Sequence, residues 1–207
     1  QLIEEPIAAA IGADLPISEA TGSMIVDIGG GTTEIAVMSL GGVVFSKSLR
    51  VAGDAMDGAI INYMRKKFNL LIGESTAEKI KKEIGTAIPT SNNIFLMKGR
   101  DIRTGTPKEI SLTEEDACEA LMPILNQMLS TIKEALENTP PELSADLVDM
   151  GLVLTGGGAL LKNIDKLISK DTGLPVTIAD NPLECVALGT GKALENEELF
   201  STMLSEY

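Results

Sequence analysis

A carboxylate stands next to a run of glycines in the segment Ile25–Val37, which reads IVDIGGGTTEIAV. Apolar residues lead into Asp27, the glycines follow, and a second apolar run leaves from Thr33. Glycine has no Cβ and can adopt positive φ, so the backbone N–H groups of such a turn can converge on phosphate oxygens. The residues that would donate to phosphate are Gly29, Gly30, Gly31, Thr32 and Thr33.

Asp27 beside this turn suits a hydrated Mg²⁺, because that ion keeps several waters and takes few protein carboxylates. The segment therefore predicts a β-hairpin whose turn holds a phosphate and a magnesium ion. The alternative is an ordinary glycine hairpin in which Asp27 is only a turn residue.

A second glycine run, Gly156-Gly157-Gly158 before Ala159, follows the apolar segment 151–155. The pattern predicts a strand, a glycine turn and a helix that continues to about Lys170. A helix N-terminus after a glycine turn is an anion- or nucleotide-binding arrangement, because its free N–H groups and its dipole favour negative charge. The run lacks the Gly-Lys-Ser/Thr ending of a Walker A motif.

Glu5 directly precedes Pro6 at the predicted start of an alanine-rich helix that stops near Gly12. Proline is favoured in the first turn of a helix and glycine just after its end. A glutamate in this place either complements the helix dipole or stands ready for chemistry at the mouth of the helix. The residues alone leave both readings open.

Glu78, Lys81 and Lys82 lie three and four positions apart in a predicted helix. Ser75 or Thr76 is expected to cap this helix, and Gly85 to end it. The spacing places the charged groups on one face. Spacing alone favours a surface helix with ion pairs over a clamp for a ribose and a base.

The elements that must position these groups follow from periodicity and turn residues. An antiparallel meander is predicted over 24–28, 33–39 and 43–50. A helix-rich block follows, with helices over 53–69 and 76–84, short strands over 93–98 and 109–112, and a long helix capped by Thr113. After the second glycine run, a strand is predicted over 176–179 and a helix over 182–194.

Composition narrows the classes of function. The chain has 207 residues, 44% of them hydrophobic, enough for one large domain or two small ones. A net charge of −13 and only 3% aromatic residues disfavour nucleic acid and anionic lipid as partners. With no histidine, imidazole catalysis and His-ligated zinc are excluded.

No apolar run reaches the roughly 18 residues of a membrane span. Cys118 and Cys185 are predicted to be reduced core thiols, which fits a cytosolic setting.

These motifs together resemble those of the actin-like ATPase superfamily, which includes actins, sugar kinases and DnaK-type chaperones. The segment 27–33 resembles its second phosphate motif, 154–161 its adenosine motif and 5–12 its first connecting helix. Within the superfamily the sequence is most similar to the MreB family of bacterial actins. Further stretches that carry this resemblance are 50–54, 76–85, 137–143 and 186–191.

The resemblance implies an α/β fold, the second lobe of the two-lobed actin architecture. Residues 1–50 and 148–207 would form a ribonuclease-H-like core subdomain, a mixed sheet flanked by helices. Residues 51–147 would form a smaller, inserted α+β subdomain. The family's first phosphate motif, in its N-terminal half, has no counterpart here.

The resemblance also implies roles for particular residues around ATP or ADP and Mg²⁺. Glu5 would orient the attacking water, with Asp27 and Thr32 completing the catalytic set. Asp27 would hold Mg²⁺ through water. The phosphates would bind Gly29, Gly30, Gly31, Thr32 and Thr33. The ribose and adenine would contact Glu78, Lys81, Lys82 and Glu83, and the adenosine side would pass Gly156, Gly157, Gly158 and Ala159.

Proteins of this kind form head-to-tail filaments in the cytoplasm, associated with the membrane, and maintain rod shape by organising the cell-wall elongation machinery. ATP hydrolysis is expected only together with the missing lobe, and neither nucleic-acid binding nor membrane insertion is expected of this lobe. The alternative is the ATPase lobe of a sugar or acetate kinase or of a DnaK-type chaperone.

Overall fold

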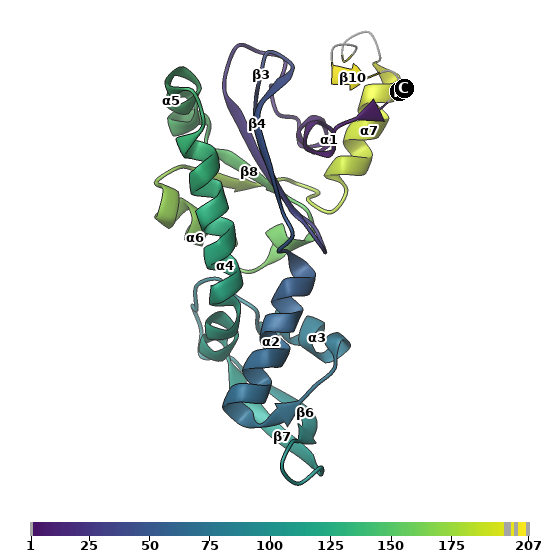
Figure 1. Cartoon of the computed structure of the whole chain (residues 1–207), viewed down its shortest axis with the longest axis vertical. Helices are drawn as coiled ribbons and strands as arrows, with labels where there is room; N and C mark the ends of the chain where they lie inside the picture. Colours follow the sequence, from purple (N-terminus) through teal and green to yellow (C-terminus); the bar gives the residue numbers. More distant parts are fainter. Residues whose placement is uncertain (1, 197–199, 201–202, 206–207) are drawn as a thin grey trace.

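The computed structural model describes residues 2–196, 200 and 203–205. The molecule is elongated, with a larger sheet towards one end, a smaller sheet at the other, and the long helix α4 (Glu114–Glu137) running between them (Figure 1). No helix in the described part of the chain combines the length and apolarity needed to cross a membrane.

The larger sheet has five strands in the order β4-β3-β2-β8-β9. The predicted meander is confirmed: β2 (Ser23–Ile28), β3 (Thr33–Ser39) and β4 (Gly42–Leu49) pair antiparallel. On the other side of β2, β8 (Leu152–Thr155) and β9 (Val176–Ile178) run parallel to it. The predicted mixed sheet flanked by helices is thus confirmed.

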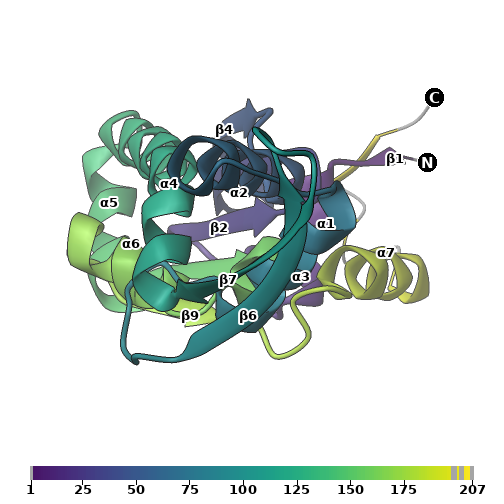
Figure 2. The ribbon, with the colours of Figure 1, turned by 90° about the horizontal axis from the view of Figure 1, so that it is seen from below.

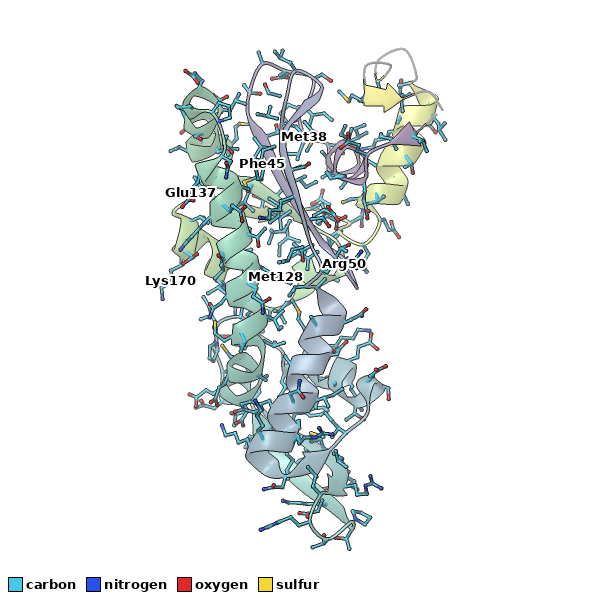
Figure 3. All side chains as sticks on the ribbon, in the orientation of Figure 1. Met38, Phe45, Arg50, Met128, Glu137 and Lys170 are labelled. Carbon is cyan, nitrogen blue, oxygen red and sulfur yellow. The ribbon has the colours of Figure 1, made fainter. Side chains whose placement is uncertain are left out.

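Alternation along the central strands gives this sheet two apolar faces. Val26 and Ile28 of β2 face the core built with α4 and α6 (Ile164–Thr172). Ile25 faces the second core, built with α1 (Glu5–Gly12) and α7 (Cys185–Glu195). Figure 3 shows Phe45 beside α4 and Met38 towards α1. Because Asp27 alternates with Val26 and Ile28, it belongs to the α1 and α7 side.

The smaller sheet is antiparallel and has the order β5-β6-β7, with bounds Leu70–Leu71, Ile94–Asp101 and Pro107–Thr113. Helices α2 (Gly53–Phe68) and α3 (Glu74–Ile84) pack beside it. Figure 2 views the molecule from this end, with β6 and β7 in front of the larger sheet. One apolar core runs through α2 and α4 and connects the two sheets.

The predicted cap of α4 is confirmed. Thr113 Oγ1 accepts a hydrogen bond from the Asp116 N–H at 3.2 Å, and the Thr113 N–H donates to Asp116 Oδ2 at 3.0 Å. These two bonds form a capping box, which satisfies N–H groups that the first turn leaves free.

Several helix boundaries differ from the sequence predictions. Helix α3 begins at Glu74 with Gly73 at its N-cap, so the predicted cap by Ser75 or Thr76 is wrong. The helix after the second glycine run is broken: a short 3₁₀ turn, η1 (Gly157–Leu160), ends before Asn163 adopts a left-handed φ of 60° and α6 starts. Helix α7 begins at Cys185, three residues after the predicted start.

Helix α5 (Pro141–Met150) was not predicted. In the sequence, the Pro140-Pro141 pair is consistent with the end of the long helix that Thr113 begins. Proline is equally suited to the first turn of a new helix, because its fixed φ is helical and its missing N–H would have no partner there. The two remaining strands, β1 (Leu2–Ile3) and β10 (Leu204–Ser205), pair antiparallel.

Candidate functional site

One cavity of about 1080 Å³ opens between the ends of β2 and β8, the first turn of α2, helix α3 and the start of α7. It brings most of the predicted site residues together. Those that line it are Glu5, Asp27, Gly29, Gly30, Glu78, Lys81, Lys82, Glu83, Gly156, Gly157 and Gly158. The remaining predicted residues, Gly31, Thr32, Thr33 and Ala159, are not among its lining residues.

The glycine turn after β2 is closed by its own backbone. The Gly29 N–H donates to the Thr32 carbonyl at 2.9 Å. Within the described part of the chain, the N–H groups of Gly30 and Gly31 make no hydrogen bond. Unpaired backbone donors at an exposed turn are the groups that an anion would bind.

The reason for glycine in this turn differs from the expected one. None of Gly29, Gly30 and Gly31 has a left-handed backbone, so the predicted need for positive φ is wrong here. Gly30 and Gly31 provide open space, whereas a Cβ on Gly29 would lie 3.3 Å from the Thr32 carbonyl oxygen. A Cβ on Gly31 would have no described atom within 4 Å, and one on Gly30 would meet only the Asp54 carboxylate, at 3.7 Å.

Thr33 lies inside the sheet rather than at the cavity. Its side chain is buried, and its hydroxyl donates to the Val51 carbonyl at 2.7 Å. That hydroxyl is therefore engaged by the backbone, and the structure does not bring it to the place where the turn would hold a phosphate.

Asp27, the last residue but one of β2, is a buried carboxylate, 6% exposed, on the cavity wall. Burial, chiefly, and the negative charge of Glu5 raise the pKa of Asp27. Thr155 is the register partner of Asp27 on β8. Thr155 Oγ1 is buried without a hydrogen-bond partner among the described residues. Buried polar groups normally have hydrogen-bond partners, so a buried carboxylate beside an unpaired hydroxyl marks a polar site whose partners are missing.

Glu5 is the first residue of α1, with Glu4 at the N-cap. It is exposed at the cavity, and its charge acts on Asp27. The helix start therefore sets a second carboxylate near the end of β2. This position of Glu5 agrees with both hypotheses from the sequence: that Glu5 complements the helix dipole, and that it stands ready for chemistry at the mouth of the helix.

The second glycine turn packs against the end of β2. Gly156 has φ 79° and ψ 170°, a backbone that is essentially restricted to glycine. A Cβ there would lie 2.3 Å from the Ile28 carbonyl oxygen and 2.4 Å from Asp27 Oδ1. These glycines thus allow the turn after β8 to lie directly on the end of β2, beside Asp27.

Helix α3 forms the opposite wall. Lys82 pairs with Glu78 at 2.6 Å across one helical turn, and both side chains are exposed. Lys81 instead donates to the Gly53 carbonyl at 2.9 Å and to Asp57 Oδ2 at 2.8 Å. Helix α3 therefore carries the surface ion pair that its spacing predicts, and it also lines the cavity.

Sequence reasoning missed several residues of the cavity wall. Asp54 and Asp57 come from the first turns of α2, and Leu160, Leu183 and Val186 form an apolar rim. The signal for the aspartates was present, since both follow the Gly53 helix start within four residues. The apolar rim carries no signal in sequence, because exposed leucines are common on protein surfaces.

A buried charge cluster fixes Lys162, another lining residue. Glu114, the first residue of α4, accepts hydrogen bonds from Lys162 Nζ, from the N–H groups of Thr90 and Ser91, and from Ser91 Oγ. The bond from Lys162 and then the bond from the Thr90 N–H hold the pKa of Glu114 at about 2, below its usual 4.5. This cluster ties the turn after η1 to the segment that follows α3.

Glu114→Gln should lower stability at neutral pH and less so in acid. A carboxyl whose pKa is depressed from 4.5 to about 2 stabilises the fold above pH 4.5, and this contribution fades as pH falls towards 2. Melting temperatures at pH 7, 4 and 3 should show a gap between wild type and variant that narrows with acid. Exposed Glu115→Gln is the control, and a gap that is constant with pH would contradict the assignment.

The fold is that of solved actin-like proteins. The chain superposes on the crystal structure of MreB 5 of Spiroplasma citri bound to AMPPNP with a TM-score of 0.91 and 39% sequence identity, covering 97% of this chain and 61% of that one. It also superposes on a subunit of the MamK double helical filament with a TM-score of 0.76, covering 93% of this chain and 58% of that one. At 22% identity this second likeness shows the fold alone.

The chain belongs to the MreB/Mbl protein family, whose model matches residues 1–202. It is 56% identical over 195 residues to the cell shape-determining protein MreB of Escherichia coli K12, covering 94% of this chain and 56% of that protein. It is 46% identical over 196 residues to the cell shape-determining protein Mbl of Bacillus subtilis, covering 94% of this chain and 59% of that protein. The chain thus spans somewhat over half the length of these relatives. The resemblance to MreB is confirmed.

Proposed function

We propose that this chain is a nucleotide-binding lobe of a filament-forming bacterial actin, and that its cavity binds ATP or ADP with Mg²⁺. One observation carries the proposal: Gly30, whose N–H group is unpaired, and the buried Asp27 line one cavity with the second glycine turn and α3, and the unpaired N–H group of Gly31 follows in the same turn. A solved relative from Spiroplasma citri is described as bound to AMPPNP, which supports the assignment.

The residues present fit a hydrated Mg²⁺. In the described part of the chain, no cluster of three or more Asp, Glu or Cys side chains could hold a metal by protein ligands alone. A hydrated Mg²⁺ needs no such cluster, since it keeps most of its waters. Asp27 would hold those waters, and the unpaired Thr155 hydroxyl lies beside it. When bound, the ion neutralises charge on the phosphates.

The other residues divide into three groups. Gly29, Gly30, Gly31 and Thr32 would surround the β- and γ-phosphates, and Glu5 would orient the attacking water with Asp27 and Thr32. Glu78, Lys81, Lys82 and Glu83, which line the cavity, would contact the ribose and adenine. The rim of Leu160 and Leu183, 58% and 70% exposed, would cover the base next to Gly156, Gly157, Gly158 and Ala159.

We propose the division into a core subdomain, residues 1–50 and 148–207, and a smaller subdomain, residues 51–147. It is supported by the two separate sheets, whose strands fall on either side of these limits. The whole protein would bind and hydrolyse ATP, assemble head to tail with itself in the cytoplasm under the membrane, and maintain rod shape with the cell-wall elongation machinery. The names of the relatives, cell shape-determining proteins, support this role.

Gly30→Val tests the function in the full-length protein. A Cβ fits at this position, so the fold should persist, but the branched side chain would occupy the space of the phosphate. We expect ATP affinity to fall at least about 100-fold, as expected when ligand and side chain compete for one volume. Filaments that pellet with ATP and Mg²⁺ should be lost as well.

Gly58→Val is the matched control for this test. Gly58 lies within α2, has no described atom within 4 Å of an added Cβ, and does not line the cavity. This variant should bind ATP and pellet like the wild type. Unchanged ATP affinity of Gly30→Val would overturn the phosphate assignment, and wild-type protein that binds ATP but never pellets would overturn the filament role.

A further inference from the structure

Two walls of the cavity are joined where the chain leaves each of them. Gly85, which follows the end of α3, and Lys162, which comes shortly after η1, both line the cavity. Thr86 forms an isolated parallel bridge with Lys162, and the Ala87 N–H donates to the Lys162 carbonyl at 2.8 Å. Thr86 and Ala87 are buried. The chain that leaves α3 is therefore bonded to the chain that leaves the second glycine turn.

Asn163 adds side-chain bonds to the same junction. Its Nδ2 group donates to the Ile88 carbonyl at 2.9 Å and to Thr86 Oγ1 at 3.3 Å. The Thr86 hydroxyl in turn donates to the Lys162 carbonyl at 3.1 Å. Asn163 has a left-handed backbone, with φ 60°, which glycine would adopt at lower cost. The asparagine at this position thus supplies an amide that bonds the segment after α3.

Glu114 bonds the same two segments through its charge. Its side chain is 2% exposed, and one carboxylate oxygen accepts hydrogen bonds from the Thr90 and Ser91 N–H groups at 2.8 and 2.9 Å. The amine of Lys162 donates to the other carboxylate oxygen. Hydrogen bonds to an ionised group are roughly twice as strong as neutral ones. Glu114 is not among the lining residues of the cavity, so its effect on a ligand there would pass through these partners.

We propose that Glu114, Lys162 and Asn163 form a clasp on segment 86–91, and that this clasp slows the release of bound nucleotide. The inference rests on the proposed function, in which α3 contacts the ribose and adenine and the second glycine turn passes the adenosine. A nucleoside held between two walls leaves when the walls move apart. Because the clasp joins these walls, their separation at this point breaks its bonds. The clasp residues are thus positioning residues, and α3 keeps its own contacts with the nucleotide.

Asn163→Gly is the mildest test of the clasp. Glycine accepts the left-handed backbone, so the substitution removes the amide bonds without adding backbone strain. In the full-length protein with Mg²⁺, a fluorescent ADP analogue chased with unlabelled ADP should dissociate about three- to tenfold faster than from the wild type. The melting temperature is measured on the same samples.

Asn69→Gly is the matched control for this test. Asn69 also has a left-handed backbone, with φ 52°, at the end of α2, and it does not line the cavity. The control makes the same change in side chain and in chain freedom, and it should release ADP like the wild type. Asn163→Gly protein that releases ADP at the rate of Asn69→Gly would overturn the proposal.

The charged part of the clasp separates positioning from a direct contact by Lys162. Lys162→Met removes the cation, and Glu114→Gln removes its partner, which lies outside the cavity lining. If the clasp acts as a unit, each variant should speed ADP release about tenfold, and the double variant E114Q/K162M should be no faster than either. If Lys162 instead acts by touching the nucleotide, Glu114→Gln should release ADP like the wild type, which would overturn the proposal.

Hydrogen exchange distinguishes a failure of the clasp from a failure of the proposed function. Without nucleotide, the Ala87 N–H should exchange about three- to tenfold faster in Asn163→Gly than in the wild type or Asn69→Gly, because its acceptor is the Lys162 carbonyl. Unchanged exchange at Ala87 would overturn the clasp itself, whether or not the protein binds ADP. Faster exchange at Ala87 in a protein whose wild type binds no ADP would support the clasp as a connection, but would overturn the proposed function and the effect on nucleotide release.

Discussion

Glu5→Gln in the full-length protein should slow ATP hydrolysis by roughly 10²–10⁴-fold and leave ATP affinity nearly unchanged. The carboxylate stands at the first residue of α1, exposed at the cavity and close enough for its charge to raise the pKa of Asp27. From there it would accept a hydrogen bond from the attacking water without touching the nucleotide. Glutamine keeps the size of the side chain but removes the charge that orients this water.

The measurement is single-turnover hydrolysis, with ATP affinity and melting temperature determined on the same samples. Glu4→Gln is the control, because Glu4 is also exposed and its side chain makes no capping bond. If Glu5 only complements the helix dipole, its loss would cost about 0.3–1 kcal/mol of stability and leave hydrolysis intact. Normal hydrolysis by Glu5→Gln would thus move the water-orienting role to another residue.

Gly156→Ala should be among the most damaging single substitutions in this chain. The backbone at φ 79° and ψ 170° is essentially closed to residues with a Cβ. The new methyl group would also collide with the Ile28 carbonyl oxygen at 2.3 Å. We expect a loss of at least about 3 kcal/mol in the free energy of unfolding, since strain and overpacking act together.

Urea unfolding of the full-length protein measures this loss, with Gly31→Ala as the control. A Cβ on Gly31 has no described atom within 4 Å, and its backbone is not left-handed. Its stability should therefore stay within about 0.5 kcal/mol of wild type. A Gly156→Ala protein as stable as Gly31→Ala would mean that the second turn does not pack on β2 as described.

Local patterns predicted the framework around the site well. The apolar runs on either side of the first glycine run predicted the meander of β2, β3 and β4, and the Thr113-Glu-Glu-Asp116 sequence predicted the start of α4. These features depend on neighbours in the chain, so a single sequence contains them. Predicted helix boundaries were wrong where a residue is suited to two structural roles. At the Pro140-Pro141 pair, proline can follow the end of one helix or stand in the first turn of the next, here α5.

The details of the cavity depend on contacts between distant segments. Thr155 meets Asp27 only because β8 runs parallel to β2 in that register. Lys81 reaches Gly53 across two helices, and Thr33 turns its hydroxyl to Val51. None of these partners lies within one turn of the other in sequence. Their pairing follows from tertiary packing, which spacing along a helix or strand does not encode.

The first glycine turn should bind nucleotide phosphate. The most direct measurement is a structure of the full-length protein with AMPPNP and Mg²⁺. We expect the terminal phosphates within hydrogen-bond distance of the Gly30 and Gly31 N–H groups, and Asp27 in contact with the waters of the metal ion. Phosphates bound away from this turn, or a nucleotide outside the cavity between β2, β8 and α3, would contradict this assignment.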